Sequence, residues 1–174
     1  MQKRPRRVTP QTRSLALALG LLAPGIGGCR GEPPPMPGPG TFSWRTYENR
    51  VIGYRVEVPD IYRPDVSDDG SSVIFRWEGA PPVKVYFTDA AAARKRGLWV
   101  RHEPSGEIRL GGRSGRLYEY EHWDGPFVSA IRAYVVAHRG RELGLEFRAV
   151  GELNEVNRHI LESFRFTPDA SRGL

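Results

Sequence analysis

The chain has 174 residues, with 26 Lys and Arg against 20 Asp and Glu and a formal net charge of +6 at neutral pH. Five basic residues and no acidic residue precede Cys29, so the rest of the chain carries 21 basic against 20 acidic residues, a net charge of +1. The excess charge therefore belongs to the first 28 residues and gives no reason to expect a nucleic acid partner. Cys29 is the only cysteine, which excludes a disulfide framework.

Residues 1–28 have the layout of a secretory signal peptide. Residues 1–13 are basic, residues 15–23 are nearly all Leu and Ala, and residues 25–28 are small apart from Ile26. The apolar stretch of about nine residues is too short to span a membrane, which takes about 20. The tetrapeptide Ile26-Gly27-Gly28-Cys29 resembles the lipobox of bacterial lipoproteins. The resemblance implies cleavage before Cys29, a diacylglyceryl thioether on its sulfur and acylation of the new amino terminus. The alternative is an ordinary signal peptide with an incidental cysteine.

Residues 29–40 are rich in proline and glycine, which favours an extended tether rather than a packed element. At ~3.1 Å per residue, this tether would hold the domain up to ~30 Å from the bilayer. A proline-rich ligand for the groove of a partner is the alternative interpretation. Residues 169–174 are expected to be a disordered tail.

The domain, residues 41–168, is predicted to consist mostly of strands. Apolar residues alternate with polar ones over residues 54–58, 73–77 and 83–87, which predicts a sheet with one buried face. Three longer candidates cover residues 115–123, 127–138 and 142–150. Asp124-Gly125 and Arg139-Gly140 separate them, and such turns favour antiparallel hairpins. The sequence therefore predicts an antiparallel meander.

Two helices are expected beside the sheet. Thr88 or Asp89 can cap a short helix over residues 90–93, which basic residues and Gly97 would end. A second helix is expected over residues 152–163. Its apolar stripe, which should lie on the sheet, consists of Leu153, Val156, Ile160 and Phe164.

The domain also resembles the PsbP-like superfamily over most of residues 41–168. The resemblance lies in a strand ending in proline (53–59), a glycine turn before a strand (110–120), residues 143–147, and a closing helix that runs into a short edge strand (160–166). It implies a single α+β domain, with an antiparallel sheet flanked by helices, and an accessory or binding role. It carries over no active site.

No catalytic, cofactor or metal constellation emerges from the residue pattern. Gly112-Arg113-Ser114-Gly115-Arg116 lacks the final glycine of a nucleophile elbow and lies in a hairpin context. His122 and Asp124 could share a strand face, but a structural zinc site needs four ligands. Glu119 and Glu121 are expected to be solvated rather than acid–base partners. We therefore expect no enzyme and no cofactor.

The best candidate contact surface is basic and aromatic: Arg94, Lys95, Arg96 and Trp99. Such residues suit anionic head groups or an acidic partner. The alternative is a helix end followed by a strand, with Trp99 facing the core.

Together these features predict a lipid-anchored, monomeric domain of the cell envelope. It would face the periplasm or the exterior, on the inner or the outer membrane, and would bind an envelope protein or another envelope component. An envelope hydrolase or a carrier of a small ligand or lipid is the alternative, and it would need a concave pocket of ~300 Å³ or more.

Overall fold

The structure is a computed structural model that describes residues 40–95, 98–124, 127–148 and 151–168. The leader, Cys29, the tether up to residue 39, Arg96, Gly97 and the tail lie outside these residues. Among the described residues, no helix has the length and apolar composition needed to cross a membrane.

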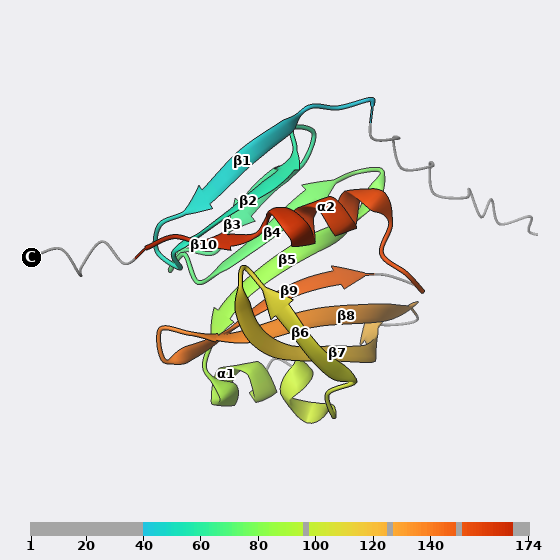
Figure 1. Cartoon of the computed structure of the whole chain (residues 1–174). Coiled ribbons are helices and arrows are strands. Elements are labelled where there is room, and N and C mark those ends of the chain that lie inside the picture. Colours follow the sequence, from blue (N-terminus) through green and yellow to red (C-terminus); the bar gives the residue numbers. More distant parts are fainter. Residues whose placement is uncertain (1–39, 96–97, 125–126, 149–150, 169–174) are drawn as a thin grey trace, which may run out of the picture. The chain divides into compact units, whose positions relative to one another are not determined.

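Two antiparallel sheets form the domain (Figure 1). The smaller has the order β1-β2-β10 and the larger the order β3-β4-β5-β9-β8-β7-β6. Their strands are β1 (Trp44–Asn49), β2 (Tyr54–Pro59), β3 (Arg63–Val66), β4 (Ser72–Trp77), β5 (Ala80–Thr88), β6 (Gly106–Leu110), β7 (Arg113–Asp124), β8 (Phe127–His138), β9 (Arg141–Arg148) and β10 (Arg165–Phe166). The fold class expected from the sequence is confirmed.

The strand order differs from one continuous meander. Strands β3 to β5 form one meander and β6 to β9 form another, and antiparallel pairing of β5 with β9 joins them. Sequence neighbours β5 and β6 therefore lie far apart in the sheet. The segment between them holds α1 (Ala90–Lys95) and a 3-10 helix, η1 (Trp99–Arg101), which lead the chain away from β5.

Helix α2 (Glu155–Ser163) begins three residues later than expected. The Asn154 side chain is the cap and accepts a hydrogen bond from the Asn157 backbone N–H at 2.8 Å. At α1, Asp89 is the cap and accepts from the Ala92 N–H at 2.7 Å. Side-chain oxygens that satisfy free N–H groups at a helix start fix where that helix begins.

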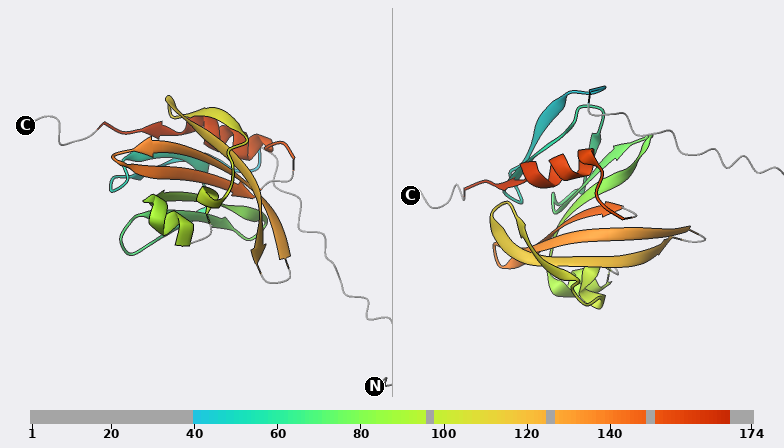
Figure 2. Two further views of the ribbon diagram at one scale, coloured as in Figure 1. Left: turned by 90° about the horizontal axis from the view of Figure 1, so that it is seen from below. Right: turned by 45° about the vertical axis from the view of Figure 1, so that its right-hand side comes forward.

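The main core lies between the seven-stranded sheet on one side and the small sheet with α2 on the other. The apolar positions expected from period two are buried except for the half-buried Trp77; the buried ones include Val56, Phe75 and Val85. The apolar stripe expected on the second helix is also buried; it consists of Leu153, Val156, Ile160 and Phe164. A second, smaller core lies on the opposite face of the large sheet, under α1 and η1 (Figure 2).

Candidate functional site

Strand directions define the edge of the domain at which its first strand, β1, begins. The β8–β9 turn contacts the β1–β2 turn, because His138 Nε2 lies 2.7 Å from the Ile52 carbonyl oxygen and Arg139 donates to the Val51 carbonyl at 3.2 Å. Strands β1 and β8 both run toward this contact, so both begin at the opposite edge. Figures 1 and 2 show the same arrangement. We call the edge where β1 begins the tether edge, and the edge with the β1–β2 and β8–β9 turns the far edge.

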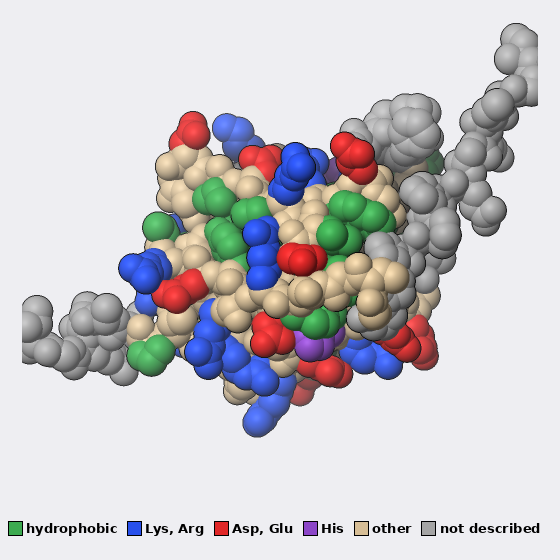
Figure 3. Space-filling model, turned by 90° about the horizontal axis from the view of Figure 1, so that it is seen from above, with side chains coloured by type: hydrophobic (Ala, Val, Ile, Leu, Met, Phe, Trp, Pro, Cys, Tyr) green, Lys and Arg blue, Asp and Glu red, His purple; other side chains and the backbone are tan. Residues whose placement is uncertain are grey.

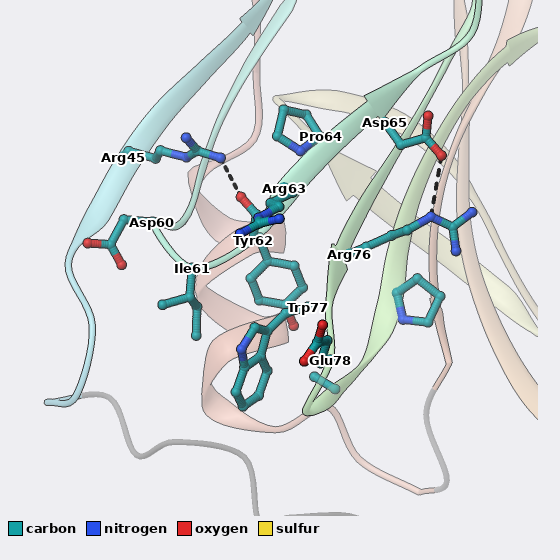
Figure 4. Close-up of a pocket in the computed structure, with 12 residues that line it drawn as sticks. Arg45, Asp60, Ile61, Tyr62, Arg63, Pro64, Asp65, Arg76, Trp77 and Glu78 are labelled. Atoms are coloured by element: carbon teal, nitrogen blue, oxygen red, sulfur yellow. Dashed lines mark hydrogen bonds and ion pairs between the residues drawn. The ribbon is translucent and has the colours of Figure 1, made fainter.

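A groove of about 1050 Å³ opens at the tether edge. Its walls come from the start of β1, the β2–β3 connection, β3 and the β4–β5 hairpin (Figure 4). Apolar parts of the lining include Ile61, Trp77 and Ala80. Its charged residues are Arg45, Arg63, Arg76, Asp60, Asp65 and Glu78. Figure 3 shows that the side of the domain carrying β1 presents hydrophobic areas separated by basic and acidic side chains.

Backbone contacts hold the groove in shape. The Asp60 N–H donates to the Ser43 carbonyl at 2.8 Å, and the Arg45 guanidinium donates to the Tyr62 carbonyl. These bonds fix the β2–β3 connection against the start of β1. The ion pair of Arg76 with Asp65, at 3.3 Å, has both side chains more than half exposed and contributes about 0–1 kcal/mol.

Trp77 has its place in the groove because residue 79 is a glycine. A Cβ added to Gly79 would lie 2.2 Å from the Trp77 ring, so only glycine lets the indole fold back over the β4–β5 turn. The side chain is half-buried and packs on the main core. The groove thus offers a fixed, partly exposed aromatic surface.

Tyr62 supplies a polar group at the base of this region. Its hydroxyl is buried and has no hydrogen-bond partner among the described residues. Burial raises the pKa of Tyr62 to about 12. The phenol is therefore neutral at physiological pH and is not a general base there.

A second hollow of about 480 Å³ contains a serine, a histidine and a carboxylate that sequence reasoning missed. His159 Nε2 lies 2.7 Å from Glu57 Oε2, and the Trp44 ring stacks on the imidazole at 3.8 Å between ring centroids. The residues are 102 positions apart in the chain, so no local spacing could reveal the pair.

This hollow does not present an activated nucleophile. The Ser163 hydroxyl accepts from the Glu57 backbone N–H at 3.0 Å and donates to the Ile160 carbonyl at 3.0 Å. A nucleophilic serine must instead donate to its base. These contacts attach α2 to β2.

The expectation that Trp99 belongs to an exposed contact surface is wrong. Its side chain is fully buried in the second core, and its indole N–H donates to Glu142 Oε2 at 3.2 Å. The alternative interpretation is confirmed in that Trp99 faces a core, but the residue lies in η1 and not in a strand. Gly144 leaves the space that the ring fills, because a Cβ there would lie 2.4 Å from it.

The structure places the remaining predicted residues apart from the groove. Arg94 and Lys95 are exposed in the last turn of α1, while Arg96 lies outside the described residues. Since β5 ends at the far edge, where Thr88 pairs with Glu142, α1 starts there as well. Binding through these basic residues stays a prediction.

On β7, Glu119 accepts from Arg132 Nε at 2.8 Å in a cross-strand ion pair. His122 is half-buried, and the side chain of Asp124 is not described. The described part of the chain holds no group of three or more His, Cys, Asp or Glu arranged for a metal ion.

No protein-family model and no curated protein matches the chain. Among solved structures, the chain is similar to cyanobacterial PsbP (CyanoP) from Synechocystis sp. PCC 6803, with 17% sequence identity and a TM-score of 0.50. The match covers 81% of this chain and 98% of that one. It shows that the domain has a PsbP-like fold.

A weaker similarity, with 15% identity and a TM-score of 0.43, is to LpqN of Mycobacterium tuberculosis, a protein involved in cell envelope biogenesis. It covers 74% of this chain and 92% of that one.

Proposed function

We propose that the protein is an envelope lipoprotein, anchored through acylated Cys29, whose PsbP-like domain binds an extracytoplasmic protein without catalysing a reaction. The observation that carries the binding role is the groove at the tether edge. It combines a half-buried indole with three arginines and three acidic residues around an open hollow.

The composition of the groove suits a polypeptide with charges of both signs. Interfaces between proteins have an apolar centre and a polar rim, and tryptophan and arginine are frequent at their strongest contacts. Trp77 supplies a central contact. Arg63, which is exposed and has no ion-pair partner among the described residues, supplies a charge for an acidic group of the partner.

The carrier of a small ligand or lipid is the second candidate, because the groove is larger than the ~300 Å³ that such a carrier needs. Small-ligand sites bury most of the ligand in a largely apolar pocket. An open groove with six charged residues fits that description less well, so we favour the protein partner.

Photo-crosslinking in intact cells tests the groove. A photoreactive amino acid replaces Glu78, which is exposed in the groove, or Arg50, whose side chain is 89% exposed next to the far-edge turn. We expect one discrete protein adduct from position 78 and none from position 50. Arg63→Glu should abolish that adduct at an unchanged unfolding midpoint.

Two results would contradict the proposal. A lipid-sized adduct at position 78 would favour the carrier. Equal products from positions 78 and 50, or a product that survives Arg63→Glu, would remove the groove as the binding site.

A further inference from the structure

The end of the β7–β8 hairpin is a two-stranded ribbon. Within the described residues, β6 pairs with β7 only up to Leu117, and β9 pairs with β8 only as far as Ile131. Beyond these points, among residues 40–95, 98–124, 127–148 and 151–168, β7 and β8 pair only with each other, from the Glu121–Ala130 pair to the Asp124–Phe127 pair. We call residues 121–124 and 127–130 the hairpin tip. It extends past the rest of the sheet (Figure 2).

The hairpin tip exposes large apolar side chains that the fold does not use. Trp123 is 67% exposed and Val128 is 46% exposed, and the two are cross-strand partners on one face of the ribbon. A lone exposed apolar residue is ordinary, but an exposed tryptophan paired with a valine at the end of a projecting ribbon indicates a contact site.

Register places the hairpin tip at the tether edge. Val83, Phe147, Arg132 and Glu119 form one row across the large sheet. The β4–β5 turn precedes Val83 and the hairpin tip follows Glu119, so both lie on the same side of this row. That side is also where β1 begins, as Figures 1 and 2 show.

The length of chain between Cys29 and the described domain indicates which surface the hairpin tip contacts. Residues 30–39 separate Cys29 from the first described residue, a span of about 34 Å at ~3.1 Å per residue. An acylated Cys29 would therefore hold the tether edge close to the bilayer. Tryptophan favours the interface between head groups and acyl chains.

The charge of the tip argues for insertion rather than electrostatic adsorption. Residues 121–130 include Glu121 and Asp124 but no Lys or Arg. Attraction to anionic lipid needs basic residues. Trp123 and Val128 can instead contact the bilayer by burying apolar surface between the lipids. The charged Glu121 and Asp124 stay in water, so the tip enters only the outer part of the leaflet.

We propose that the hairpin tip inserts into the interface of the bilayer that carries Cys29, as a second membrane contact beside the lipid anchor. This proposal rests on the lipid attachment in the proposed function. The two contacts together would fix the orientation of the domain and hold the groove beside the membrane surface.

Fluorescence on the full lipidated protein in phosphatidylcholine vesicles tests the insertion. Because acylation blocks the Cys29 thiol, Val128→Cys introduces one free thiol for a polarity-sensitive dye. Val51→Cys is the matched control, since Val51 is also an exposed valine, at 63%, but lies at the far edge. We expect a blue shift and quenching by brominated lipid at position 128 and neither at position 51, with no change in 1 M salt.

A second variant tests the tryptophan. Trp123→Ser in the Val128→Cys background should reduce the quenching while the protein stays with the vesicles. The insertion would be overturned if the dye at position 128 showed the emission of an aqueous environment, or if the signals at positions 128 and 51 were equal. If Cys29 itself takes up dye and the protein leaves the vesicles, the lipid anchor fails and the insertion proposal fails with it.

Discussion

Single residues decide how the second core is built. Gly144 lies on β9 directly under the Trp99 ring, and the buried tryptophan follows from that missing side chain. The sequence offered a core-facing Trp99 as an alternative, but it does not indicate that Gly144 makes room for the ring, because the glycine is 45 positions away and pairs with Tyr86 and Val135 on neighbouring strands.

Gly144→Ala should destabilise the protein, because the new methyl group would lie 2.4 Å from ring carbons of Trp99 in a packed interior. Overpacking of this kind costs about 1–3 kcal/mol. Gly106→Ala is the control, since a Cβ there meets nothing within 4 Å. Urea unfolding measures both, and equal midpoints for the two variants would show that the ring moves aside freely.

Glu146 should make stability depend on pH. Its carboxylate is buried, accepts from the Tyr120 hydroxyl at 2.7 Å and has Lys84, Tyr86 and His122 nearby. Burial raises the pKa of Glu146 despite the opposing effect of these groups. A raised pKa in the folded state stabilises the fold at pH values below the unfolded pKa, and this stabilisation is lost as the pH rises through the folded pKa.

Glu146→Gln keeps a carbonyl acceptor for Tyr120 but cannot ionise. We expect its advantage in unfolding free energy over the wild type to be larger at pH 8 than at pH 4. Urea unfolding across this range gives the difference, with the exposed Glu107→Gln as control. A difference that is constant with pH would show that the carboxyl does not titrate differently in the folded state.

At the scale of elements, strands with one buried face could be predicted and edge strands could not. Residues 54–58 alternate because their neighbours cover one face, whereas all four residues of β3 are exposed and β10 has only two residues. The groove was missed for the same reason. Part of its lining comes from the edge strands β1 and β3 and from the β2–β3 connection, which leave no period in the sequence. The rest comes from the ends of β4 and β5, whose period does not indicate that they face these elements.

We expect helix α2 and the residues around it to be indispensable for folding. A chain that ends at residue 151 loses Leu153, Val156, Ile160 and Phe164, all at most 7% exposed, and burial of each is worth about 1.5–3 kcal/mol. Their sum is comparable with the whole stability of a domain, about 5–15 kcal/mol. Circular dichroism should show no cooperative melting, whereas a chain of residues 41–168 should melt cooperatively and be monomeric. An unchanged melting temperature on ending the chain at residue 151 would contradict this role of α2.

At the scale of the whole molecule, we predict that the lipid anchor on Cys29 decides where the protein is found in the cell. Cys29→Ser should move the protein from the membrane to the soluble fraction, because a single apolar leader segment of about nine residues cannot anchor it. Fractionation after a carbonate wash measures this. The far-edge variant Arg50→Glu should stay with the membrane, and retention of Cys29→Ser would refute the lipoprotein interpretation.

The pairing of β2 with β10 has a consequence for the order in which the chain folds. The Glu57 N–H bond to the Ser163 hydroxyl joins residues 106 positions apart, and β10 completes the small sheet from the very end of the domain. Strand β2 can pair with β1 as soon as both are made, but it lacks β10, its neighbour on the other side, until almost the whole chain is present. Pairings between residues far apart in the chain slow folding, so we expect the small sheet to be completed late. In the lipoprotein that we propose, this late step would leave the domain incomplete while the chain crosses the membrane through a narrow translocation pore.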